Sequence, residues 1–153
     1  MNSGEIAQFP IYESEKRVTE RGVKESATSF ANKGAVLISI TRYIRASVLA
    51  IDACFNQSVV AVLPNKNYPT AFLYPFIESQ IPRYMALRTG AQQPHINKNT
   101  IEETLLAVPP LDSGIMNEYV KETQIVYKSI LEDTKKMAKS IAIDSFDMPV
   151  LLN

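Results

Sequence analysis

The sequence has few of the residues from which enzymes build active sites. It holds one histidine, His95, and one cysteine, Cys54, and no group of His and Cys with the spacing of a metal site. Its five glycines are scattered singly, which excludes a glycine-rich phosphate-binding loop. Carboxylates are frequent, but no pair stands out in an apolar setting. We therefore expect no catalysis by this chain alone, no metal site and no bound cofactor.

Long hydrophobic runs are also lacking. No apolar stretch reaches membrane-spanning length, and the first residues lack the basic and then apolar pattern of a signal peptide. Cys54 lies in the apolar stretch 49–55, can form no internal disulfide, and is expected to be a buried structural thiol. Together these absences predict a cytoplasmic protein with no membrane partner.

Charge of one sign is not in excess, because 16 Lys and Arg balance 16 Asp and Glu. Residues 1–110 hold eleven basic and nine acidic residues, and residues 111–153 hold five and seven. This weak asymmetry neither demands nor excludes nucleic acid as a partner, since a local basic face is enough. A length of 153 residues with 46% apolar residues allows one domain with a core and an appended element.

The most regular pattern in the chain is a heptad repeat within residues 111–143. Spacings of four and three alternate for nearly four heptads, which predicts one long amphipathic helix. The seam residues are Met116, Val120, Thr123, Tyr127, Ile130, Thr134, Met137 and Ile141. Pro109 and Pro110 cannot continue a helix, so Asp112 is expected to cap this one, with Leu111 packed against Met116 as a hydrophobic staple.

Such a helix cannot bury its seam alone, and two arrangements are open. The helix can lie on the domain of its own chain, or it can form an intermolecular coiled coil. The seam is longer than the preceding domain would cover, and no second heptad run lies upstream to pair with it. Pairing with another chain is therefore favoured, and the eight seam residues are predicted dimerisation residues.

The rest of the chain predicts short strands and helices. Strands are expected near residues 9–12, 35–40, 47–51, 58–63 and 105–108. A helix is expected over residues 69–87, capped by Thr70 and kinked or split by Pro75 and Pro82. Residues 18–23 are expected to form an ordered turn, and Thr100 to begin a helical turn through a capping box.

These elements predict an α+β fold. The strands are closely spaced, which favours a small antiparallel or mixed sheet with short helices. The expected division is a compact domain over residues 1–110, a spacer helix over 111–146 and a tail over 147–153.

Two loops, around residues 41–46 and 88–98, hold side chains suited to binding DNA. Gln and Asn can pair bidentately with adenine edges, whereas Arg and Lys contact phosphates or guanine. The candidate DNA-binding residues are Arg21, Lys24, Arg42, Arg45, Arg88, Gln92, Gln93, His95, Asn97 and Lys98. The alternative is that the second loop is a structural turn whose amides satisfy buried backbone groups.

Several weak motifs occur in a specific order. They are TERGVKES at 19–26, KGAVLIS at 33–39, FNQSV at 55–59, FLY at 72–74, GAQQPHI at 90–96 and VPPL at 108–111. Together, over residues 18–145, they resemble the specificity subunit of Type I restriction–modification systems. The resemblance covers one target-recognition domain followed by its spacer helix.

The resemblance implies that this chain is half of such a subunit. In that family two spacer helices pack as an antiparallel coiled coil and hold two recognition domains apart, so that each domain reads one half of a bipartite site. It implies these partners: double-stranded DNA, a DNA adenine methyltransferase subunit that brings the S-adenosylmethionine chemistry, the restriction subunit, and a second copy or another specificity chain. Two identical domains would read a palindromic target.

The sequence also departs from the family pattern. Asp112-Ser113-Gly114 stands where a Glu-Gln pair usually follows, which bears on methyltransferase docking and on the helix start. Residues 41–45 replace a turn that usually contains glycine, which favours Arg42 and Arg45 as DNA contacts. The usual first strand and glycine-rich turn are lacking, so a shortened domain is expected.

Two other functions stay open at the level of sequence. One is a degenerate structural or oligomerisation module that no longer binds DNA. The other is a small enzyme that uses His95 near Arg88, which requires a concave pocket around His95.

Overall fold

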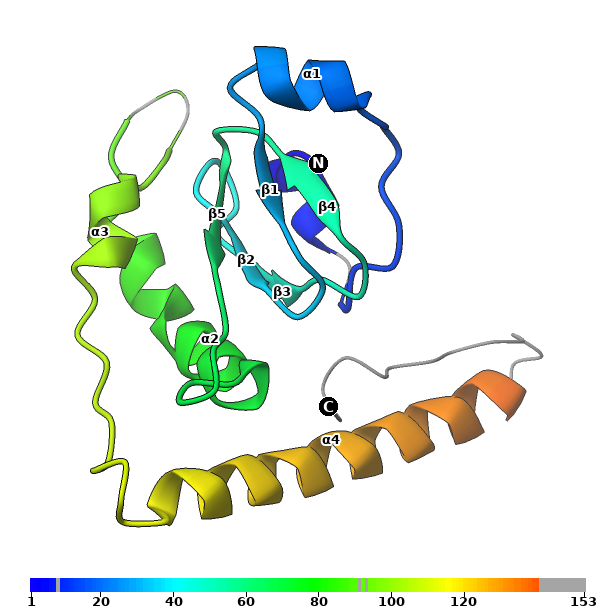
Figure 1. Ribbon diagram of the computed structural model, residues 1–153, viewed down its shortest axis with the longest axis vertical. Coiled ribbons are helices and arrows are strands. Elements are labelled where there is room, and N and C mark those ends of the chain that lie inside the picture. The colour runs from blue at the N-terminus through cyan, green and yellow to red at the C-terminus, as the bar shows by residue number, and fades with distance from the viewer. Residues whose placement is uncertain (8, 91, 93, 141–153) are drawn as a thin grey trace.

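The computed structural model describes residues 1–7, 9–90, 92 and 94–140, and its fold is α+β, as predicted (Figure 1). The strands are β1 (Ser29–Ala31), β2 (Val36–Ser39), β3 (Ala46–Val48), β4 (Ala53–Phe55) and β5 (Val59–Val62). The helices are η1 (Ser3–Ala7), α1 (Glu20–Glu25), α2 (Thr70–Ala86), α3 (Lys98–Glu102) and α4 (Ile115–Ser140).

The strands form two small antiparallel sheets. One has the order β3-β2-β5, with Val36 opposite both Val48 and Val62, and the other pairs β1 with β4. All four residues of β2 are buried. Val36 and Ile38 belong to the core that α2 covers, whereas Leu37 belongs to a second core with residues of η1, β1 and β4. Burial on both faces explains why β2 is a continuous apolar run rather than an alternating one.

Helix α2 is continuous through Pro75 and Pro82, so of the two expected outcomes, a kink or a split, the split is wrong. Phe72, Leu73, Ile77 and Tyr84 are buried along one of its faces. An interior proline costs a helix about 3 kcal/mol or more, and this continuous packing is the physical reason the helix persists. Thr70 is not the cap either. Pro69 occupies the N-cap position, and the Thr70 hydroxyl donates to the Gly34 carbonyl at 2.7 Å.

Other local predictions need correction. Residues 105–108 form no strand, and Leu105 is 90% exposed. Strands β1 and β4 were not predicted, and the expected turn near residue 20 is helix α1. The expected strand near residue 10 contributes only a bridge between Ile11 and Leu49. Helix α3 starts at Lys98 rather than at Thr100.

Helix α4 begins at Ile115, later than predicted. Gly114 has a left-handed backbone with φ of 73°, and the Ser113 hydroxyl accepts the Ile115 N–H at 3.3 Å. The predicted staple is wrong, because Leu111 is 56% exposed. The chain therefore enters α4 through a glycine turn that lies where the family's Glu-Gln pair would stand.

The first half of the heptad seam packs on the chain's own domain. Met116 is buried, and Val120, Thr123 and Tyr127 are half-buried. Figure 1 shows the later part of α4 running past α2. The side chains of Ile130, Thr134 and Met137 and the whole of Ile141 lie outside the described residues. Pairing of the seam with a second chain stays a prediction.

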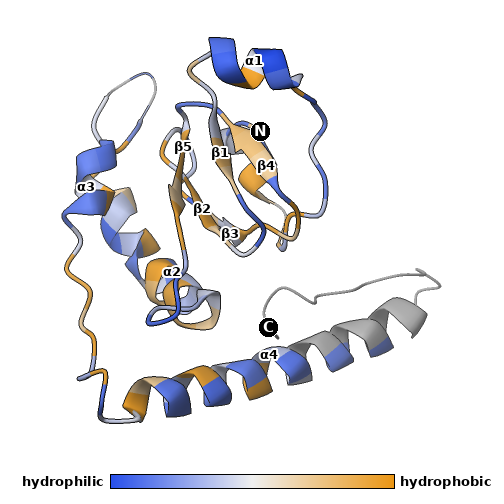
Figure 2. Ribbon diagram, in the orientation of Figure 1, coloured by the Kyte–Doolittle hydropathy of each residue, from blue (hydrophilic) through white to orange (hydrophobic). Residues whose placement is uncertain are grey.

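No helix in the described ranges has the length and apolarity that crossing a membrane requires. Figure 2 shows hydrophobic and hydrophilic stretches alternating along the described part of α4, as in an amphipathic helix.

Candidate nucleic-acid interface

Two loops far apart in sequence lie against each other. The turn at residues 40–45 connects β2 to β3, and the loop at residues 88–97 follows α2. The Arg42 N–H donates to the Pro94 carbonyl at 2.8 Å, and the Ile96 N–H donates to the Ile40 carbonyl at 3.0 Å. Thr89 and His95 exchange two backbone hydrogen bonds of 2.9 Å. The two segments that the sequence nominated for DNA contact therefore form one surface.

Hydrophobic anchors hold this surface to the core. Ile44 in the turn is 3% exposed and Ile96 in the loop is 2% exposed, and both belong to the core that α2 covers. Arg42, Tyr43 and Arg45 flank Ile44 and are exposed. Because buried Ile44 fixes the backbone of the turn, the side chains of Arg42 and Arg45 beside it point to solvent from a fixed position.

Arg42 has an unusual backbone. Its φ is 62°, and it is the one non-glycine residue with positive φ among those the structure describes. A left-handed conformation costs an L-residue roughly 1–2 kcal/mol. Such conformations persist where surrounding contacts determine them, and they cluster at functional sites. Arg42 is therefore held in place at the tip of the turn.

Arg88 supplies part of that support. Its Nε donates to the Met85 carbonyl at 2.9 Å, and its Nη1 donates to the Arg42 carbonyl at 3.3 Å. The guanidinium thus links the end of α2 to the turn. This predicted DNA contact has a backbone-holding role that its residue type did not reveal.

Ser39 holds the turn from inside. It is fully buried, and its hydroxyl donates to the Tyr43 carbonyl and accepts the Arg45 N–H at 3.0 Å. The Arg45 guanidinium lies over the Tyr43 ring, 5.3 Å from its centroid. Tyr43, which the sequence did not single out, therefore positions a candidate DNA contact.

Replacing Ser39 with alanine is expected to lower the free energy of unfolding by about 1–3 kcal/mol, because it removes a buried hydroxyl that makes two hydrogen bonds to the backbone of the turn. Urea denaturation measures this change. Ser79→Ala is the matched control: its exposed hydroxyl bonds one helical carbonyl, and about 0.5 kcal/mol or less is expected. Equal effects of both variants would contradict this role of Ser39.

The remaining loop candidates divide by role. Gln92 is exposed near the loop tip, and Gln93 lies outside the described residues. Asn97 caps α3, because its side chain accepts the Asn99 N–H at 3.1 Å. Lys98 pairs with Glu102 at 3.0 Å on the exposed face of α3. His95 is exposed and joins both loops through its backbone.

Arg21 and Lys24 lie elsewhere, on helix α1. Figure 1 shows α1 at the end of the molecule that is away from α4. The loop that follows α2 is separate from α1 in this view. Thr19 caps this helix by accepting the Gly22 N–H at 3.1 Å. The Arg21 guanidinium pairs with Glu25 at 2.9 Å, and both side chains are exposed. Such an exposed pair is worth little and is readily exchanged for a phosphate.

A shallow groove lies beside the turn. It has a volume of about 390 Å³, and its lining includes Ile40, Phe30, Asn56, Gln57 and Lys98. The Asn56 side chain accepts from the backbone and hydroxyl of Ser58, at 3.1 and 2.6 Å, which orders the turn between β4 and β5. Gln57 is exposed at this turn. The Asn-Gln motif at 56–57 thus lies next to the candidate interface, although neither residue was among the sequence candidates.

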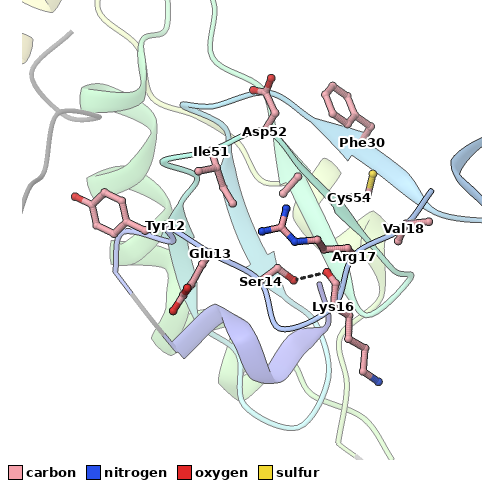
Figure 3. A pocket seen from close by; sticks show the side chains of 11 residues that line it. Tyr12, Glu13, Ser14, Lys16, Arg17, Val18, Phe30, Ile51, Asp52 and Cys54 are labelled. Carbon is pink, nitrogen blue, oxygen red and sulfur yellow. Dashed lines mark hydrogen bonds between the residues drawn. The ribbon is translucent and has the colours of Figure 1, made fainter. Parts of the chain in front are cut away.

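A second depression, of about 380 Å³, lies between residues 12–18 and the β1–β4 sheet (Figure 3). Its lining mixes cationic Lys16 and Arg17 with acidic Glu13 and Asp52, and Cys54 is half-buried at its wall. His95 lines neither this depression nor the groove beside the turn. In the part of the chain that the structure describes, no group of His, Cys, Asp and Glu could hold a metal ion.

The fold and the site define a class of protein. A small α+β domain presents cationic and amide side chains from two joined loops, and a long helix leaves its opposite end. The family model for the Type I restriction modification DNA specificity domain matches residues 2–139, so the chain belongs to this family. No curated protein matches the chain. The chain thus carries a DNA specificity domain of Type I restriction–modification systems, which gives it a role in DNA recognition.

Proposed function

We propose that this chain reads one half of a bipartite DNA site and docks methyltransferase subunits of a Type I system. The observation that supports this proposal most directly is that the turn at residues 40–45 and the loop at residues 88–97 are hydrogen-bonded to each other. Their backbones are fixed by hydrogen bonds, and their exposed side chains include Arg42, Arg45 and Gln92. Preorganised side chains of these types suit direct contact with base edges in the major groove.

Individual roles are proposed from the geometry of the described residues, and that of Gln93 from its residue type alone. Arg42, Arg45, Gln92, Gln93 and His95 are the proposed base contacts. Arg21, Lys24 and Lys98 are the proposed phosphate contacts, because they are exposed on helices and carry at most solvent-exposed ion pairs. Arg88 and Asn97 act mainly by holding the loops through backbone groups.

The second part of the proposal concerns assembly. Residues 1–110 form the reading domain and residues 111–146 the spacer that pairs with a second copy or another specificity chain. Because α2 already covers the first half of the seam, the partner would contact the later seam residues Ile130, Thr134, Met137 and Ile141. Ile115, Ile125 and Val126 are also exposed beside the covered seam and are available to a partner chain. A symmetric dimer would read a palindromic bipartite target.

Affinity purification of the tagged full chain from its own bacterium tests the proposal. We expect to recover a DNA adenine methyltransferase, and we expect the assembly to enrich one two-part motif from random duplexes. Binding should weaken with salt, with a log–log slope of about −0.9 per phosphate contact.

Recovery of the chain alone, with no salt-sensitive DNA binding, would instead favour a structural module. Mass spectrometry of the eluate and sequencing of the enriched duplexes separate the two outcomes.

A further inference from the structure

Aromatic side chains attach the spacer helix to the domain. The ring of Phe9 stacks on Tyr74 of α2, with centroids 4.6 Å apart. Tyr74 in turn faces Tyr127 of α4 at 6.3 Å, and Phe72 meets Tyr119 edge-on at 5.6 Å. Of the described α4 residues packed on this core, Tyr127 lies furthest along the helix. Among the described side chains of α4, Tyr127 is therefore the last one in this contact.

A carboxylate on α2, Glu78, lies beside this contact. The Tyr74 hydroxyl donates a hydrogen bond to Glu78. Burial, followed by the negative charge of Glu78, raises the pKa of Tyr74 well above its usual range. Burial is also the main cause that raises the pKa of Tyr127 to about 12. Both phenols thus stay neutral at any physiological pH.

A long stretch of helix follows Tyr127, so a small change of angle at this residue moves the end of α4 by several ångströms. Met116 to Tyr127 spans about 16 Å of helix, and the helix continues for roughly 20 Å to Ser140. A tilt of about 10° at Tyr127 would move the far end by roughly 3.5 Å. That displacement is about the rise of one DNA base pair. A small change of angle at this contact therefore moves the far end of the helix by a distance comparable with one base-pair step.

We infer that Tyr127, seated against Tyr74, is a positioning residue that sets how many base pairs the assembly accepts between its two half-sites. This inference rests on the proposed function. Tyr127 touches no DNA in this scheme. It determines the angle between domain and spacer, whereas Arg42 and its neighbours determine which bases are read.

The test measures binding of the full chain, with its partner subunits, to duplexes that carry the enriched half-sites with the gap varied one base pair at a time. The parent is expected to prefer one gap length at least 10-fold over its neighbours. Tyr127→Ala is expected to reduce that preference to under 3-fold while the enriched half-site bases stay the same. Tyr127→Phe keeps the ring and should restore the parental preference.

Lys128→Ala is the matched control, because Lys128 is exposed beside Tyr127 and should leave the gap preference unchanged. If Tyr127→Ala does not fold by circular dichroism, Tyr127→Leu keeps the apolar bulk and is expected to show the same loss. An unchanged gap preference in the folded variant overturns the inference but leaves DNA reading intact. If the parent itself enriches no two-part motif, the proposed function fails and the inference fails with it.

Discussion

Arg42→Ala is expected to weaken binding to the cognate duplex by roughly 5- to 150-fold, the equivalent of about 1–3 kcal/mol for one base contact. The turn holds Arg42 from its N–H and from its carbonyl, so little backbone entropy is lost when its side chain meets DNA. Fluorescence anisotropy with the enriched duplex measures the change. The fold should persist, since alanine keeps the same left-handed strain.

Arg42→Gly distinguishes the effect of losing the side chain from the effect of the strained backbone. Glycine adopts positive φ without steric cost, so this variant should unfold at a urea concentration equal to or above that of the parent. It should nevertheless bind DNA as weakly as Arg42→Ala. A stable protein with poor DNA binding is hard to explain by misfolding. Parental affinity in both variants would mean that Arg42 is not a base contact.

Ile130→Asp is expected to have the second large effect. A carboxylate in the later seam should abolish pairing of the spacer helices, because burying an unpaired charge in an interface is costly. Affinity for a duplex with both half-sites should then fall about 10²- to 10⁴-fold, which is the gain that linkage of two weak sites provides. Affinity for a single half-site should change little.

Ser129→Asp provides the matched control for this prediction. It adds the same charge one residue away, at an exposed position off the seam, and should leave the oligomer intact. Sedimentation velocity measures the oligomeric state of both variants, and anisotropy measures their affinity for one and two half-sites. If Ile130→Asp sediments like the parent, the seam does not pair two chains.

The order of motifs in the sequence was enough to identify the family, and the match over residues 2–139 confirms it. The α+β class and the long helix were also predictable. The run at 36–39 is apolar enough to be a strand in any context, and the heptad period of residues 116–137 favours only a helix. These signals are local or periodic, so no knowledge of distant neighbours is needed to read them.

Tertiary contacts decided the rest. Strands β1 and β4 have three residues each and exist because they pair with each other. Pro75 and Pro82 look like helix breaks until the packing of α2 on the sheet is considered. Likewise, the heptad pattern marks one face of α4 as apolar, but does not say that α2 covers its first half.

The candidate site divides in the same way. The sequence by itself determined that residues 41–46 and 88–98 hold cationic and amide side chains. Only the fold decided that these loops meet, that Arg42 adopts a left-handed backbone, and that Arg88 and Asn97 bond to backbone groups. Residue type sets which hydrogen bonds a side chain can make. Which partner it meets depends on segments more than forty residues away, and their approach is set by burial of Ile44 and Ile96 in a shared core.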